Sequence, residues 1–337
     1  MTRHAALHRW LAHFGSLRTA LALIVLLAAV VLAHPSAPLL GLAFAALGIN
    51  LLSALVVHPL LRRRLPLLVF HLALLALVLL VGAGRLMRLD GRFELLQGEA
   101  FGGRLLDQDA GALYVPRLER LAFRNEGFEI DYAAGRRRGA TRNAVRWLDA
   151  DGVARRAVIG DHRPLVIDGH RIYTTPNKGF APVMRWQPAA GGEPVRGAVH
   201  LPSYPMHELR QATEWTLPDG TRVWLMLRFD ETLIAPDAPG RFRMPEQHHL
   251  VLRLGEARIE LQPGQAWPLA NGTLVYEGLR TWMGYRVSHD PALPWLLAAA
   301  LLAALSLAWH YASSFRTPRE AATGTAIAST SPGVTHA

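Results

Sequence analysis

The chain has 337 residues, of which 51% are hydrophobic and 18% are charged, and its formal net charge is +10. The apolar residues are gathered into long blocks, which indicates a membrane protein, so the positive charge is not evidence for nucleic-acid binding. The sequence contains no cysteine, which excludes disulfide exchange, thiolate metal sites and attachment of a cofactor through cysteine.

Four apolar segments are predicted to cross the membrane, because each is long enough for roughly 30 Å of hydrocarbon. In chain order they are residues 17–33, 39–61, 65–84 and 293–311. Arginines precede the first span, join the second to the third at Arg62 to Arg64, and follow the fourth at Arg316 and Arg319. Since the link 33–38 carries no basic residue, both termini are predicted to be cytoplasmic. An alternative interpretation is that residues 1–37 form a cleaved signal peptide.

The third span contains one ionisable residue, His71, which lies six residues inside the apolar segment. At about 1.5 Å of rise per residue it is roughly 10 Å from the basic turn, at membrane depth. An ionisable side chain at that depth is a candidate functional group. The alternative is that the imidazole serves as interhelical glue by hydrogen-bonding a neighbouring helix.

Residues 85–292 are polar and are predicted to form a large, mostly β domain outside the cytoplasm. Four Asx-Gly pairs separate short apolar runs, and such pairs suit the tight type I′ turns of β-hairpins. These pairs are Asp151-Gly152, Asp168-Gly169, Asp219-Gly220 and Asn271-Gly272. The strands expected beside them are 143–148, 153–159, 170–174, 221–229, 250–254 and 274–279. Residues 187–205 and 235–245 are expected to be loops, and the tail 312–337 is expected to be disordered.

No Gly-rich phosphate loop, His-Glu-x-x-His motif or Gly-x-Ser-x-Gly elbow occurs in the chain, so no catalytic residues are predicted. His248 and His249 are adjacent and would point to opposite faces of a strand, which makes a shared metal difficult. The other histidines of this domain have no metal-site spacing and are expected to be exposed or hydrogen-bonded. They are His162, His170, His200, His207 and His289. The Arg136 to Arg138 run is interpreted as a solvated loop, with a docking site for an acidic partner as the alternative.

The order of these features resembles the ResB (CcsB) family of System II cytochrome c biogenesis proteins. The first span begins with SLRTALAL at residues 16–23, which is similar to the opening of that family. Phe70-His71 and the later element GRFELLQGE, residues 91–99, resemble its third span and the exit from it. The segment GLRTWMGYRVSHDP, residues 278–291, resembles its last strand before the fourth span.

The resemblance implies an integral membrane protein with four transmembrane α-helices and a large extracytoplasmic β domain between helices three and four. It implies a bacterial inner-membrane subunit of the cytochrome c synthase, a haem lyase, that helps to carry haem outward and present it to apocytochrome c. His71 matches the family position regarded as an axial ligand of haem iron, here a non-covalently bound haem b, and imidazole is a standard axial ligand. The implied partners are a ResC (CcsA) protein that supplies the second ligand, apocytochrome c and a possible thiol-reducing protein.

The sequence leaves two other functions open. The chain could be a scaffold that holds apocytochrome c or the partner subunit without contacting haem, in which case His71 would be interhelical glue. It could also be a sensor with an outer ligand-binding domain, although the short cytoplasmic segments leave no room for an output domain.

Overall fold

The computed structural model describes residues 3–33, 37–149 and 151–316, which form two compact units. The helical unit comprises Met1–Ala83 and Ala292–Ala337, and the β unit comprises Gly84–Pro291. The helices are α1 (Arg3–Phe14), α2 (Leu17–Leu32), α3 (Ala37–Val57), α4 (Pro59–Arg63), α5 (Leu65–Met87) and α6 (Leu293–Arg316). Most of the tail that was expected to be disordered lies outside the described residues.

Three helices in the described part of the chain are long and apolar enough to cross a membrane, through Leu39–Val57, Leu65–Met87 and Leu293–Ser313. The first predicted span corresponds to α2, whose 16 residues rise only about 24 Å and fall short of the hydrocarbon thickness. The second predicted span is also shorter than expected. It breaks before Pro59, because proline lacks the amide hydrogen that would continue α3.

The turn between α1 and α2 packs directly on α3. A Cβ atom added to Gly15 would lie 2.7 Å from the Ala54 amide nitrogen and 2.8 Å from the Ser53 carbonyl carbon, so only glycine fits. Ser16 then caps α2, because its Oγ accepts the Thr19 amide hydrogen at 3.3 Å.

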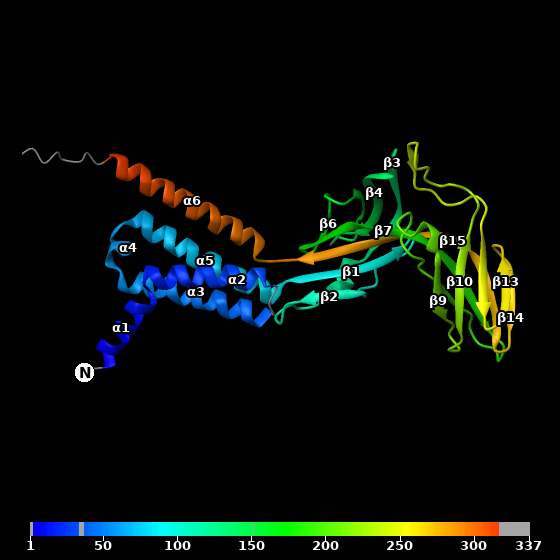
Figure 1. Ribbon diagram of the computed structural model, residues 1–337, viewed down its shortest axis with the longest axis horizontal. Coiled ribbons are helices and arrows are strands. Elements are labelled where there is room, and N and C mark those ends of the chain that lie inside the picture. The colour runs from blue at the N-terminus through cyan, green and yellow to red at the C-terminus, as the bar shows by residue number, and fades with distance from the viewer. Residues whose placement is uncertain (1–2, 34–36, 150, 317–337) are drawn as a thin grey trace, which may run out of the picture. The chain divides into compact units, whose positions relative to one another are not determined.

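The β unit contains three antiparallel sheets (Figure 1). The largest has the order β2-β1-β15-β7-β6, with β14 beside β15 and β8 beside β7, and the others are β13-β12-β10-β9 and β11-β3-β4-β5. The bounds are β1 (Leu89–Leu96), β2 (Asp107–Ala110), β3 (Phe123–Ala133), β4 (Arg137–Leu148), β5 (Ala154–Ile159), β6 (Leu165–Ile167), β7 (His170–Pro188), β8 (Val195–Ala198), β9 (Ala212–Thr216), β10 (Arg222–Arg228), β11 (Gly240–Arg241), β12 (His249–Leu254), β13 (Ala257–Leu261), β14 (Ala266–Leu269) and β15 (Gly272–His289), with 3₁₀ turns η1 (Leu118–Leu121) and η2 (Glu208–Arg210).

All four Asx-Gly pairs join paired strands, which confirms the predicted hairpins. At the β6–β7 turn Asp168 has φ of 47° and Gly169 has φ of 75°, as a type I′ turn requires. The predicted strands at 170–174 and 274–279 are only parts of β7 and β15, which pair with each other along almost their whole length. The two predicted loops each contain a short strand, β8 and β11.

Aromatic side chains fill the interior of the β unit. Phe93, Phe123 and Tyr285 form one cluster, in which the Phe93 and Tyr285 rings stack at 5.1 Å. A second cluster contains Phe180 of β7 and Tyr204 of the segment after β8, whose ring centroids are 5.2 Å apart. Both clusters are fully enclosed, so the three sheets share a continuous core.

The arginine run after β3 matches the predicted solvated loop only at Arg137, whose side chain is exposed, because its two neighbours form ion pairs. Arg136 forms a bidentate ion pair with Glu208, and Arg138 binds Asp161 at 2.7 Å, both in part-buried positions. These carboxylates lie 72 and 23 residues away in the chain, so the sequence alone did not reveal them as partners.

Candidate functional site

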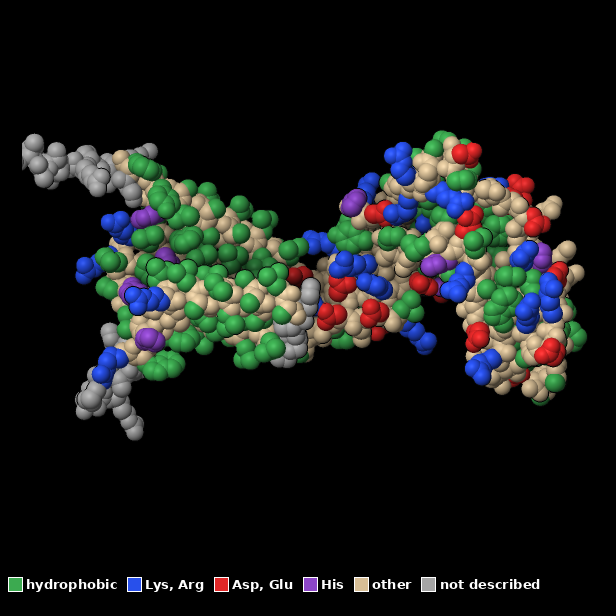
Figure 2. Space-filling view, in the orientation of Figure 1, with side chains coloured by type: hydrophobic (Ala, Val, Ile, Leu, Met, Phe, Trp, Pro, Cys, Tyr) green, Lys and Arg blue, Asp and Glu red, His purple; other side chains and the backbone are tan. Residues whose placement is uncertain are grey.

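His71 lies in the second turn of α5 and is neither fully buried nor fully exposed. The ring of Phe70 meets the imidazole edge-on, with centroids 5.3 Å apart. Figure 2 shows that hydrophobic side chains cover most of the helical unit and that Arg and His side chains gather at one end of it. His71 is therefore an ionisable group on a strongly apolar helix.

The hydrogen bond of His71 fixes its tautomer. Nδ1 lies 2.8 Å from the carbonyl oxygen of Leu67, one turn earlier in the same helix. Because a carbonyl oxygen can only accept, Nδ1 carries the hydrogen and Nε2 of the neutral ring carries the lone pair. Among the described residues, none forms a hydrogen bond with Nε2.

This arrangement suits a metal ligand. Histidines that bind metals usually donate their second ring hydrogen to a carbonyl or carboxylate, which orients the ring and raises its basicity. A haem needs only axial ligands from protein, because the porphyrin supplies the other donors to the iron. The donor chemistry of His71 therefore fits one axial position of a haem.

Two polar residues that were not singled out from the sequence do join helices. Asn50, which is buried on α3, donates through Nδ2 to the carbonyl of Phe14 at 2.5 Å. His58, which follows α3, donates through Nε2 to the carbonyl of Gly15 at 3.2 Å. These bonds tie α3 to the turn after α1, whereas the hydrogen bond of His71 to Leu67 stays within α5. The only sequence signal was a polar side chain in an apolar segment, which His71 shares.

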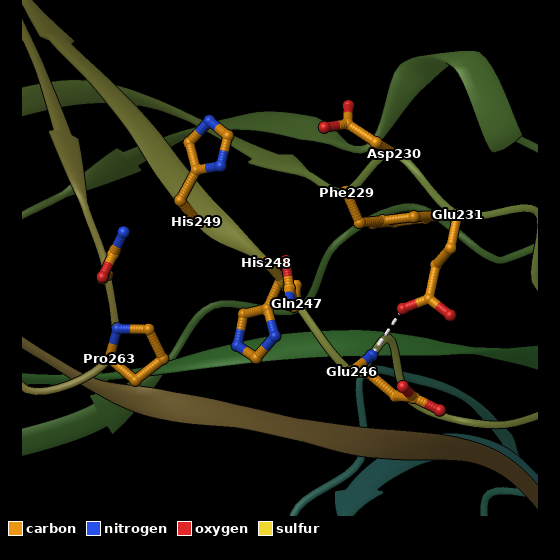
Figure 3. Close-up of a pocket in the computed structure, with 9 residues that line it drawn as sticks. Phe229, Asp230, Glu231, Glu246, Gln247, His248, His249 and Pro263 are labelled. Atoms are coloured by element: carbon orange, nitrogen blue, oxygen red, sulfur yellow. Dashed lines mark hydrogen bonds between the residues drawn. The ribbon is translucent and has the colours of Figure 1, made fainter.

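The β unit contains a pocket of about 660 Å³ beside the start of β12, lined by residues that include Glu231, Glu246, His248 and His249. In Figure 3 the imidazoles of His248 and His249 point to opposite sides of the chain, as expected for neighbouring residues in extended backbone. The Glu231 carboxylate accepts a hydrogen bond from the backbone amide of Glu246 at 2.5 Å, so it joins the two ends of the segment 231–246 that precedes β12. Burial lowers the pKa of His248 and favours its neutral form.

The other histidines of the β unit are distributed over several strands and loops. His170 and His289 stack with centroids 4.3 Å apart, and Tyr114 Oη lies 3.0 Å from His170 Nε2. His200 Nδ1 contacts Glu94 at 2.5 Å while its ring lies parallel to Trp282. Within the described residues, no group of three or more His, Asp or Glu side chains is arranged to hold a metal ion.

Comparison with known proteins gives one informative result. The ResB-like family matches residues 61–231, just over half of the chain, from α4 to the edge of the pocket in the β unit. No curated protein sequence gives a significant match to the chain. The matched segment contains His71 together with β1 to β10.

Proposed function

The chain belongs to the ResB-like family and acts in cytochrome c biogenesis, and from this we propose that it is a subunit of the haem-delivering cytochrome c synthase. Haem is the cargo in this proposal, and His71 holds its iron in the membrane through Nε2. In this proposal the protein lies in the bacterial inner membrane. Its β unit lies outside the cytoplasm, in the periplasm, where apocytochrome c receives the haem.

The hydrogen bond of His71 is the observation that carries the proposal. The bond from Nδ1 to Leu67 keeps the Nε2 lone pair directed away from the backbone of its own helix. The role of interhelical glue, which the scaffold hypothesis gives to His71, is performed in the helical unit by Asn50 and His58. The ring of His71 is thus held in the tautomer that iron requires.

A partner completes the site. Axial ligation of haem iron uses two positions, and His71 fills one of them. We assign the other to a ResC (CcsA) membrane protein, so the haem is shared between two chains. The present chain is then a non-catalytic half of the lyase, and covalent attachment to apocytochrome c requires the complex.

Coexpression with a ResC-like partner, in cells that lack their own maturation system, tests the proposal. The purified complex is assayed for haem content and for its Soret spectrum. His71→Ala should reduce retained haem at least about tenfold, because loss of even a supporting partner of a ligating histidine costs roughly 10–100-fold in metal affinity. Added imidazole should restore part of the haem by filling the vacant position.

His58→Ala is the matched control, because it removes a histidine of the helical unit that bonds a backbone carbonyl of another segment. It should leave the haem content unchanged. If the haem content and Soret band survive His71→Ala, the ligand assignment is wrong and the scaffold hypothesis takes its place. Equal loss in both variants would trace the effect to helix packing.

A further inference from the structure

A short apolar loop closes one end of the large sheet, at the point where α5 passes into β1. Residues 111–116 have the sequence GALYVP and contain no charged residue. Ala110 pairs with Leu89, and Leu89 pairs with His289, so this sheet end begins two residues after α5 ends. We call these residues the 111–116 loop.

The backbone of the 111–116 loop is fixed to the last turn of α5. The amide of Leu113 donates to the carbonyl of Leu86 at 2.7 Å, and the amide of Gly111 donates to the carbonyl of Arg88 at 2.9 Å. A Cβ atom at residue 111 would collide with the carbonyl group of Leu86, so only glycine permits this approach. The loop must therefore follow the end of α5 wherever that end lies.

Side chains of the loop alternate between the protein and the surroundings. Tyr114 turns inward, and its hydroxyl donates to His170 Nε2, since His170 Nδ1 already donates to the carbonyl of Asp168. Leu113 and Val115 turn outward and are 62% and 65% exposed. Two large apolar side chains thus project from a loop whose intervening residue anchors it.

We propose that Leu113 and Val115 insert into the boundary between lipid headgroups and acyl chains on the membrane face where α5 emerges. The 23 residues of α5 rise about 34 Å, slightly more than the roughly 30 Å of hydrocarbon, so its last turn reaches this boundary. Lipid is the occupant because the loop is bonded to the turn that lies there, and apolar side chains partition into this zone. The proposal is independent of the role of His71.

The absence of cysteine allows a direct test with single-cysteine variants of the full chain in lipid nanodiscs. Leu113→Cys and Val115→Cys are each labelled with a polarity-sensitive fluorophore. Val195→Cys is the control, because Val195 is 49% exposed and pairs with Trp186. Trp186 pairs with Leu274, fifteen residues along β15 from His289, which corresponds to about 50 Å of strand.

Labels at 113 and 115 should emit at shorter wavelength than the label at 195, and nitroxide lipids should quench them at least about threefold more strongly. Aqueous iodide should quench mainly the label at 195. Iodide quenching at 113 and 115 equal to that at 195 would overturn the proposal. Protection from both quenchers would also overturn it, because a protein surface would then cover the loop. Because each loop site is tested in its own variant, the proposal can still be tested if one of the two variants fails to fold.

Discussion

In the β unit Phe93, Phe123 and Tyr285 are at most 2% exposed, whereas in the helical unit Leu79 of α5 and Val25 of α2 are 62% and 68% exposed. The β unit buries its aromatic side chains within its own sheets and satisfies the requirements of a water-soluble domain. The helical unit leaves apolar side chains for lipid or another protein to cover. The β unit is therefore stabilised by contacts among its own side chains, whereas the helical unit needs lipid or another protein to cover its apolar surface.

The largest expected effect concerns the side of the membrane on which the β unit lies. The arginines at the helix ends predict cytoplasmic termini, so the β unit should lie across the membrane from Arg64. Alkaline phosphatase fused after Gly220 should be active, and fusions after Arg64 or Arg319 should be inactive. The reverse pattern of activity would show that the topology is inverted and that the β unit lies in the cytoplasm.

Truncation of a buried side chain in the β unit should reduce stability more than truncation of an exposed side chain in the helical unit. Phe93→Ala is expected to cost about 3–5 kcal/mol in the free energy of unfolding, because it leaves a cavity in an aromatic core. Leu79→Ala, on the exposed face of α5, should cost less than about 1 kcal/mol. Chemical denaturation of the purified chain followed by circular dichroism measures both. Equal costs would mean that the α5 face is already covered in the purified protein.

The smallest expected effect on stability comes from a buried charge, and this effect depends on pH. Lys178, the only lysine, is 3% exposed, and burial, reinforced by Arg138, lowers its pKa to about 8. Below that pH the folded state must hold a buried ammonium, so stability should rise with pH between about 8 and 10, where only the unfolded chain keeps the proton. Lys178→Met should stabilise the β unit by up to about 3 kcal/mol at pH 7.

Thermal unfolding at pH 7 and at pH 9.5 measures this difference. The stabilising effect of Lys178→Met should shrink at the higher pH, because the wild-type amine has then lost its proton in the folded state. A benefit that is independent of pH would show that packing, and not charge burial, controls the site.

Local sequence signals accounted for much of the fold. Asp168 and Gly169 specify their turn through backbone conformation alone, and the position of the apolar segments is read directly from composition. The extent of β7 and β15 could not be predicted, because it depends on pairing between residues about a hundred positions apart. The same limit explains why Arg136 was interpreted as solvated when its partner is Glu208.

The candidate site divides in the same way. The polar character of His71 in an apolar helix was visible in the sequence, and its hydrogen bond to Leu67 follows from helical geometry four residues away. The partners of Asn50 and His58 lie 36 and 43 residues earlier and depend on how α3 packs against the first turn. Family membership supports the general role in cytochrome c biogenesis, and the role of His71 as an iron ligand stays a prediction.

The paired strands β7 and β15 run through the β unit and contribute to both of its ends (Figure 1). β1 joins β15 near His289, and β14 joins it near Gly272, so opening either end disturbs the same ribbon of hydrogen bonds. Such a shared element couples local fluctuations into one cooperative unit instead of two independent ones. A ligand that binds at one end of the β7–β15 pair should therefore slow amide hydrogen exchange at the other end as well.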